Sequence, residues 1–303
     1  MIRNERSSMT RLLQRQKLLV GILQVFGSRL PNTDFQKYLF LFTQEFEKKP
    51  SFDFVPYRFG GFSFQSYADK RRLIDIGILD NENDWQLKDC SSTKNNTAYE
   101  KDLRRFYAKY SLLKGEELIK DVYRRYPYYA IKSEIASQYM NVQERRVIEQ
   151  ERPMADDPCL FTIGYEGISI DTFLNRLIKN NIKVLVDVRR NPISRKYGFS
   201  KKSLSSIVKS VGIEYSHHFE LGITSEKRQH LITQADYDHL FTSYENDVLS
   251  NKLKALQDLF TFFCNKKRIA LMCFEADSSM CHRKRLAKAM TTLPKWHYTI
   301  EHI

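Results

Sequence analysis

The chain has 303 residues, a formal net charge of +13 and a pI near 9.4. Hydrophobic residues make up 42% of it, enough for packed cores in two domains of ordinary size. No run of about twenty apolar residues occurs, which argues against a transmembrane helix and a membrane partner. The positive charge favours an acidic partner, and we expect nucleic acid, DNA in particular. The simpler alternative is a basic protein that merely stays soluble.

Cysteine content and the first residues bear on the compartment. Five cysteines are few, scattered and odd in number, which argues for reduced thiols rather than a disulfide framework. Residues 1–6 contain no apolar signal core. We therefore expect a cytoplasmic protein, and the sequence leaves its oligomeric state open.

Residues 1–95 are predicted to form an α-rich, winged-helix-like domain. Apolar residues spaced three and four apart predict a helix over 10–26, and capping residues begin a second helix over 31–46. A turn rich in glycine and aromatic residues, 57–64, leads into a third helix over 63–76. A hairpin follows over 78–87. Three helices and a hairpin are the elements of a winged helix.

The third helix would be the recognition helix of this domain. It carries Lys70, Arg71 and Arg72, which we predict to contact DNA. The alternative is a dimerisation or docking domain with a solvated basic face. The aromatic-glycine turn before this helix loosely resembles Panacea/SocA-type domains over about ninety residues.

A helical connector is expected over residues 96–157, after a polar linker at 91–97. It is strongly charged, and its tyrosines at 126, 128 and 129 stand beside Arg124 and Arg125. Such tyrosines can stack on exposed bases, although more often they pack between domains. A stretch with two prolines, 152–158, marks the next boundary.

The domain over residues 158–303 opens with two short apolar runs, 160–164 and 184–188, separated by an amphipathic helix over 171–179. This βαβ pattern predicts a Rossmann-like α/β fold with a mostly parallel sheet. Ligands of such sheets bind beyond the carboxyl ends of the strands. The remaining expected elements are helices over 200–211, 237–244, 251–264 and 281–290, and strands from 213, over 268–274 and over 296–300.

Glu166, Asp187 and Glu275 each follow a predicted strand, so three carboxylates are expected to converge as catalytic residues. Converging carboxylates split their pKa values, so that one donates a proton while another stays ionised. Cleavage of a glycosidic bond uses this arrangement. The alternative is that Asp187 and Glu275 form structural ion pairs with nearby arginines.

Basic and aromatic residues at the same edge are predicted to bind substrate. Between Asp187 and Glu214 there are seven Lys or Arg residues and no Asp or Glu, which suits a polyanion backbone. Tyr165 is a candidate for stacking on a base, and one of His217 and His218 for acid–base work. The predicted substrate-binding residues are Tyr165, Arg189, Arg190, Ser194, Arg195, Lys201, Lys202, His217, His282 and Arg283.

Cys273, Cys281 and His282 leave further alternatives open. The spacing Cys-x7-Cys-His is not a standard structural zinc pattern, although Glu275 or His217 is conceivable as a fourth ligand. Cys281 near a helix N-terminus could instead be a reactive thiolate. Cys273 is most simply a small buried apolar residue. We therefore expect neither a metal nor another cofactor.

A set of motifs in this half resembles the family named only as domain of unknown function 488. Their order and spacing agree over about 130 residues, and the resemblance implies a fold and a site but no reaction. The motifs are Thr162 to Gly167, Asp187 to Arg189, Pro192, Ser194 and Arg195, Phe199 and Ser200, Gly212 to Tyr215, Leu221 and Gly222, Met272 to Glu275, and Cys281 to Arg283.

The function predicted from these residues is a nucleic-acid-acting enzyme, most concretely a DNA base glycosylase or related N-glycosidic hydrolase. The winged helix would supply DNA affinity, and the α/β domain would take a flipped nucleotide. Such an enzyme suits antiviral defence against foreign or modified DNA. The alternative is a non-catalytic DNA-binding regulator whose α/β domain senses a nucleotide or phosphate ligand.

Overall fold

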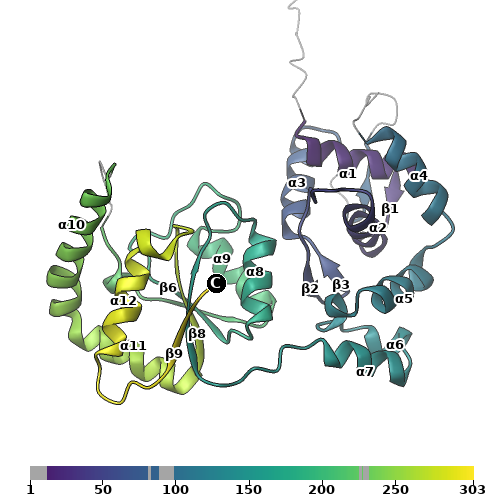
Figure 1. Cartoon of the computed structure of the whole chain (residues 1–303). Helices are drawn as coiled ribbons and strands as arrows, with labels where there is room; N and C mark the ends of the chain where they lie inside the picture. Colours follow the sequence, from purple (N-terminus) through teal and green to yellow (C-terminus); the bar gives the residue numbers. More distant parts are fainter. Residues whose placement is uncertain (1–11, 81–82, 89–98, 225–226, 228–231) are drawn as a thin grey trace, which may run out of the picture. The chain divides into compact units, whose positions relative to one another are not determined.

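The computed structural model describes residues 12–80, 83–88, 99–224, 227 and 232–303. The polar linker predicted at 91–97 lies outside these ranges. The chain divides into two compact units, Met1–Arg152 and Pro153–Ile303 (Figure 1). None of the described helices is both long enough and apolar enough to span a lipid bilayer.

The first unit contains the helices and hairpin expected of a winged helix. Its three leading helices are α1 (Gln14–Val25), α2 (Asn32–Glu45) and α3 (Phe64–Asp75). Strand β1 (Arg29–Leu30) pairs antiparallel with β4 (Trp85–Gln86), and an antiparallel bridge joins Leu79 to Leu87. The predicted hairpin is therefore present. Its strand β4 also pairs with β1, the short strand between α1 and α2.

The predicted turn before α3 is a short antiparallel hairpin of β2 (Val55–Tyr57) and β3 (Gly60–Phe62). Gly60 has a φ of 97°, and a Cβ there would lie 2.6 Å from a ring carbon of Tyr123. Only glycine satisfies both conditions. Ser63 then caps α3, because its hydroxyl oxygen accepts a hydrogen bond from the backbone N–H of Ser66 at 3.3 Å.

The predicted connector is part of the first unit and not a separate body. The ring centroid of Phe106 lies 5.4 Å from that of Phe42, and those of Tyr126 and Tyr129 lie 4.9 and 4.7 Å from that of Phe40. Phe106 is buried, and the two partly buried tyrosines pack their rings on Phe40. The helices of this segment are α4 (Glu100–Tyr110), α5 (Gly115–Arg125), η1 (Pro127–Ala130), α6 (Ala136–Tyr139) and α7 (Val142–Gln150).

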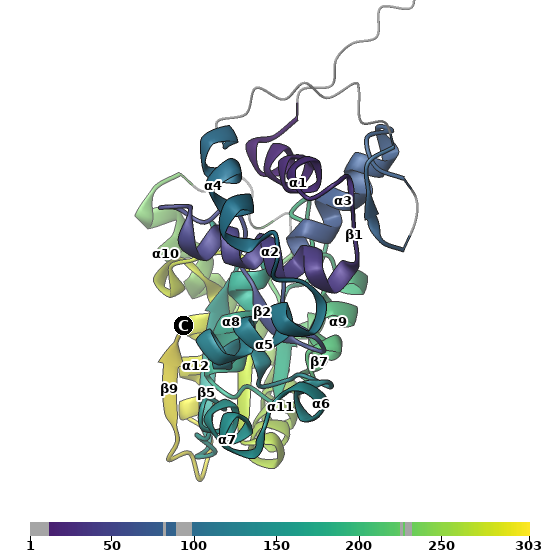
Figure 2. The same ribbon diagram turned by 90° about the vertical axis from the view of Figure 1, so that its right-hand side faces the viewer.

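The second unit is built on a five-stranded parallel sheet in the order β7-β6-β8-β5-β9, with β7 and β9 at opposite edges (Figure 2). Every pairing in it is parallel, which confirms the Rossmann-like prediction. The strands are β5 (Cys159–Gly164), β6 (Val184–Asp187), β7 (Glu214–His217), β8 (Arg268–Cys273) and β9 (Thr299–His302).

Helices cover both faces of this sheet, with α8 and α9 on one side and α10, α11 and α12 on the other (Figure 1). The three central strands are fully buried, as continuous apolar strands require. The helices and helical turns are α8 (Ile170–Lys179), α9 (Lys201–Ser210), η2 (Phe219–Leu221), α10 (Gln234–Tyr244), η4 (Glu245–Leu249), η5 (Ser250–Lys252), α11 (Leu253–Lys266), η6 (Ser278–Met280) and α12 (His282–Thr291).

The last strand begins later than the sequence predicts. Trp296 and Tyr298 pack their rings against Phe263, with centroid distances of 5.6 and 4.9 Å. Lys295 before them has a φ of 70°, which interrupts an extended chain. The apolar residues at 296–298 therefore pack against α11 and do not form a strand. Pairing with β5 starts at Thr299.

A fragment of residues 153–303 is expected to fold alone, because the boundary between the units falls at Pro153. Its first residues belong to this unit: Asn181 donates to the carbonyl of Ala155 at 2.8 Å, and Arg268 to that of Asp157 at 2.6 Å. Urea unfolding followed by circular dichroism should show one cooperative transition. A shorter fragment, 158–303, lacks both carbonyls and should unfold at lower urea. Insolubility of the longer fragment would mean that the two units share a core.

Candidate functional site

The three strands that carry the predicted carboxylates are adjacent in the sheet. Gly164 of β5 aligns with Cys273 of β8, and Asp187 of β6 aligns with Met272 of β8. Because the strands are parallel, the residues after them leave at the same edge. The topology therefore places Glu166, Asp187 and Glu275 at the same edge of the sheet, as expected.

Asp187 is fully buried and its carboxylate receives four hydrogen bonds. One oxygen accepts from the backbone N–H and the Nε of Arg189, at 3.1 and 2.9 Å. The other accepts from Nη2 of Arg189 at 2.6 Å and from the hydroxyl of Tyr215 at 2.7 Å. Four donors occupy the acceptor sites of one carboxylate. Asp187 thus forms the structural ion pair that was the alternative to catalysis, and it positions Arg189.

Arg189 is held charged and fixed by this arrangement. Burial opposes its charge, but the hydrogen bonds and negative charge of Asp187 raise the pKa of the guanidinium. Burial also raises the pKa of Tyr215, and the carboxylate of Asp187 raises it further. Arg189 donates its third hydrogen bond, from Nη1, to the hydroxyl of Tyr165 at 3.0 Å. A rigid, permanently charged donor is suited to binding an anion.

A pocket of about 320 Å³ opens beside Arg189 at this edge of the sheet. Five of the ten predicted substrate-binding residues line it: Tyr165, Arg189, Arg190, Ser194 and Arg195. The structure therefore brings three arginines to one cavity. The other residues that line it are Asn191, Ile193, Ile223 and Phe274.

The expectation that Tyr165 stacks on a base is wrong. Its side chain is 3% exposed, and its ring stacks on Phe199 with a centroid distance of 4.2 Å and an angle of 10°. Phe274 packs edge-on against the same ring at 5.3 Å. Phe274 itself is 43% exposed and lines the pocket, so it is the aromatic surface available to a ligand. Sequence reasoning placed Phe274 in the strand and did not consider its exposure.

Glu166 lies next to the segment that contains Glu275. Its Oε2 accepts a hydrogen bond from the backbone N–H of Ala276, the residue after Glu275, at 3.0 Å. Lys196 donates to the carbonyl of Tyr165 at 2.9 Å. Partial burial lowers the pKa of the Lys196 ammonium, and the charge of Glu166 opposes that shift. Lys196 was missed as a site residue, although it follows Arg195 within the one-sided basic run.

Lys201 and His217 support the site from outside the pocket. Lys201 Nζ lies 2.9 Å from Nδ1 of His217, and Nε2 of His217 lies 2.9 Å from the carbonyl oxygen of Arg189. The imidazole therefore donates from Nε2 and accepts at Nδ1, which holds the backbone of Arg189. Lys202, in the first turn of α9, is exposed.

His282 and Arg283 are buried, 0% and 1% exposed, so their prediction as substrate contacts is wrong. Arg283 donates to the carbonyls of Glu275 at 2.6 Å and of Ala276 at 3.0 Å. These bonds hold the segment after β8 to the first turn of α12, and the same segment also passes close to the end of β5. At Gly164 a Cβ would lie 1.8 Å from the carbonyl oxygen of Glu275, so this approach requires glycine.

The alternative of a reactive thiolate at Cys281 does not agree with the surroundings of that residue. Cys281 is 1% exposed, and burial raises the pKa of its thiol well above the usual value, with the neighbouring Cys273 adding to the shift. A buried, protonated thiol is a poor nucleophile. The four described cysteines are all free thiols.

Of the three DNA contacts predicted in the first unit, one is buried and two are exposed. Lys70 is 5% exposed, and its ammonium donates to the carbonyl of Asn83 at 3.0 Å and lies 5.0 Å from the centroid of Trp85. Lys70 therefore holds the hairpin against α3, and the prediction that it contacts DNA is wrong. Arg71 and Arg72 are exposed on α3.

Comparison with known proteins finds a family match within the second unit. No curated protein and no solved structure matches the chain. Residues 169–290, which run from the cap of α8 through α12, match one family model. The C-terminal half of this chain thus carries a domain of the family described as domain of unknown function DUF488.

Proposed function

We propose that the second unit is an N-glycosidic hydrolase that acts on a nucleotide of DNA. The observation that carries the proposal is the pocket with Arg189, Arg190 and Arg195 beside the strand ends that bear Glu166 and Glu275. Arginines bind phosphate oxygens with paired donors, and paired carboxylates cleave glycosidic bonds.

In this proposal the arginines hold a phosphate of the flipped nucleotide, and the base lies against Phe274, with Ile193 beside it. Ile193 is 85% exposed and lines the same pocket, so it offers an apolar surface to the base. Arg71 and Arg72 on α3 add affinity for the duplex.

The reaction breaks the bond between C1′ of the sugar and a ring nitrogen of the base. The electron pair of that bond goes to the base, which takes a proton from the carboxyl group of Glu275, next to the pocket-lining Phe274. A water molecule adds to C1′ and gives its proton to the exposed carboxylate of Glu166. The products are a free base and an abasic sugar, and no oxidant or cofactor is consumed.

The direct test is incubation of the full chain with modified and unmodified DNA, followed by mass analysis of small products and of the strand. A released base together with an abasic site of matching mass is the expected result. Intact DNA in every sample, at protein concentrations that saturate binding, would contradict the hydrolase.

The second candidate is a regulator whose α/β unit senses a nucleotide or phosphate without chemistry. One observation favours it: Asp187, the carboxylate closest to the anion-binding arginine, is saturated by hydrogen bonds. A sensor would bind nucleotide in the pocket and release no base, whereas the hydrolase releases it.

DNA binding is expected to weaken steeply as salt increases, because each neutralised phosphate releases about one counterion. Arg195→Ala should lower the slope of log K against log salt by about 0.9, the value for one lost phosphate contact. Lys183→Ala is the matched control, since Lys183 precedes β6 at the opposite end of the strand. Fluorescence anisotropy at several salt concentrations measures both. A flat salt response, or equal slopes for Arg195→Ala and the parent, would remove the electrostatic argument.

A further inference from the structure

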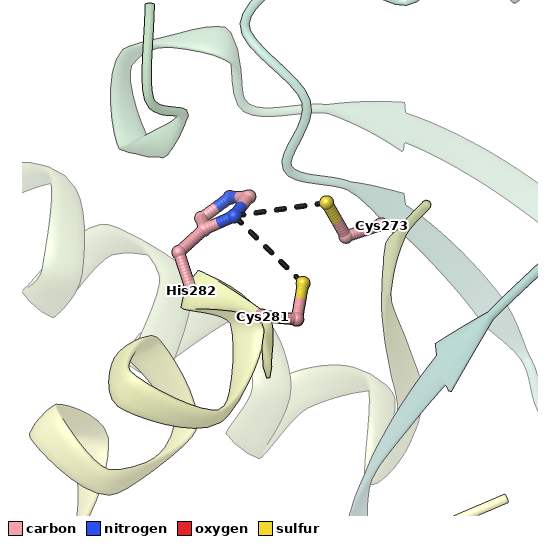
Figure 3. A group of neighbouring side chains, drawn as sticks. All are labelled: Cys273, Cys281 and His282. Atoms are coloured by element: carbon pink, nitrogen blue, oxygen red, sulfur yellow. Dashed lines mark hydrogen bonds between the residues drawn. The ribbon is translucent and has the colours of Figure 1, made fainter. Parts of the chain in front are cut away.

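Cys273, Cys281 and His282 form a cluster that the proposed reaction does not use. Cys273 is the last residue of β8, Cys281 is the N-cap of α12 and His282 is its first residue, so the two segments meet at this point (Figure 3). Their side chains are 0%, 1% and 0% exposed. The two sulfur atoms and an imidazole nitrogen all lie within 4.8 Å of one another.

The orientation of His282 is fixed by its other nitrogen. Nε2 lies 3.2 Å from the carbonyl oxygen of Val188, which can only accept, so Nε2 carries the hydrogen. In the neutral ring Nδ1 is then an unprotonated lone pair, and it points toward both sulfur atoms (Figure 3). Histidine ligands of metals are oriented in this way, with the far N–H on a backbone carbonyl.

The distances suit a shared ion. Nδ1 lies 3.6 Å from Sγ of Cys273 and 3.9 Å from Sγ of Cys281. A tetrahedral zinc ion, with Zn–S near 2.3 Å and Zn–N near 2.0 Å, places nitrogen and sulfur ligands about 3.5 Å apart. A single nitrogen lone pair accepts from one thiol at a time, whereas one ion between the three atoms binds all of them at once.

We propose that Cys273, Cys281 and His282 bind one zinc ion with a structural role. Two thiolates and an imidazole are ligands that zinc prefers over hard cations such as Mg²⁺. A water molecule completes the tetrahedron, because the group of mutually close ligand atoms consists of Cys273, Cys281 and His282 alone among the described residues. Two thiolates neutralise the ion, and the metal removes the thiol protons that burial otherwise retains.

The ion would fix the wall behind the pocket. Through Cys273 it holds the segment that presents Phe274, and through His282 it is linked to Val188, directly before Arg189. It also joins β8 to α12 where Arg283 already binds the backbone of the same segment. Because the ligands are buried and do not line the pocket, the ion has no access to substrate there. This inference is independent of the proposed hydrolase and would hold equally for a sensor.

The experiment uses the full chain without a metal-binding tag, purified under reducing conditions without chelator, and measures metal content by mass spectrometry. About one zinc per chain is expected, and Cys281→Ser and His282→Asn should lose it. Cys159→Ser and Cys264→Ser are the controls, since one is a buried and the other an exposed cysteine elsewhere; both should keep the ion. Glu275→Gln should keep the ion as well, since Glu275 does not belong to the group of mutually close ligand atoms.

A second measurement does not depend on variants that fold. Parent protein stripped by chelator and titrated with Co²⁺ should develop the visible bands of a tetrahedral site and a thiolate charge-transfer band. Readdition of zinc at about 100 times its Kd should raise the Tm by roughly 5–10 °C. Parent protein that binds neither Zn²⁺ nor Co²⁺ under anaerobic conditions, or Cys281→Ser that keeps the full metal content, would overturn the proposal.

Discussion

Replacing Asp187 with asparagine is expected to lower the free energy of unfolding of the second unit by about 3–5 kcal/mol. The amide nitrogen of asparagine would face donors, so two of the four hydrogen bonds to the carboxylate are lost. Arg189 would then remain buried, 6% exposed, without its counter-charge. Removing one partner of a buried ion pair costs more than the pair contributes, since the remaining charge is uncompensated.

Two controls separate this effect from the loss of any carboxylate. Tyr215→Phe removes a single hydrogen bond to Asp187 and should cost about 1–3 kcal/mol. Asp156→Asn makes the same substitution in an exposed pair with Lys183, at 3.9 Å, and should change stability by less than about 0.5 kcal/mol. Calorimetry of the full chain follows the transition of the second unit in each variant. If Asp187→Asn keeps its stability but loses activity, Asp187 is a proton-transfer residue and not a structural ion-pair partner.

The parallel sheet could be predicted from the sequence because its central strands are buried on both faces and therefore read as continuous apolar runs. The order of the strands could not. β8 lies between β5 and β6, although about a hundred residues of the chain separate it from β5 and about eighty from β6. Only this placement brings Phe274 and Glu275 between the segments that carry Glu166 and Arg189.

The pocket arginines were predictable for a local reason. They lie in one segment directly after β6, and a strand end in a parallel sheet fixes where that segment begins. Phe274 and Lys196 were missed because their roles depend on contacts with Tyr165, which is distant from both in the sequence.

Which basic residues are buried could not be predicted. Lys70 and Arg283 resemble solvated charges in the sequence, but each donates to backbone carbonyls of a neighbouring segment. Such partners are invisible to side-chain patterns, because every residue has a carbonyl. The same limit applies to the helices after residue 99. Their apolar face could be predicted from the sequence, but the helix that this face packs against, α2, could be identified only from the fold.

The largest effect on activity is expected at Glu166 and Glu275. If the unit is the hydrolase that we propose, Glu166→Gln and Glu275→Gln should each lower kcat by about 10²–10⁴, because an amide keeps the shape but cannot exchange a proton at neutral pH. Folding should survive in Glu166→Gln, because the oxygen of the introduced amide can still accept from the N–H of Ala276, the bond that Glu166 accepts at 3.0 Å. DNA affinity should also persist, since the arginines are untouched.

Glu214→Gln is the matched control for these variants. Glu214 begins β7, at the amino end of the sheet, and its exposed carboxylate pairs with Lys266 at 2.7 Å. It should keep full base release, while zinc content, measured alongside, shows whether Glu275→Gln acts through the metal site instead. Loss of turnover in both glutamate variants with unchanged Tm, DNA affinity and zinc supports proton transfer. Base release at the parent rate by both would remove the carboxylates from the chemistry, and the arginine pocket would then be the ligand site of a sensor.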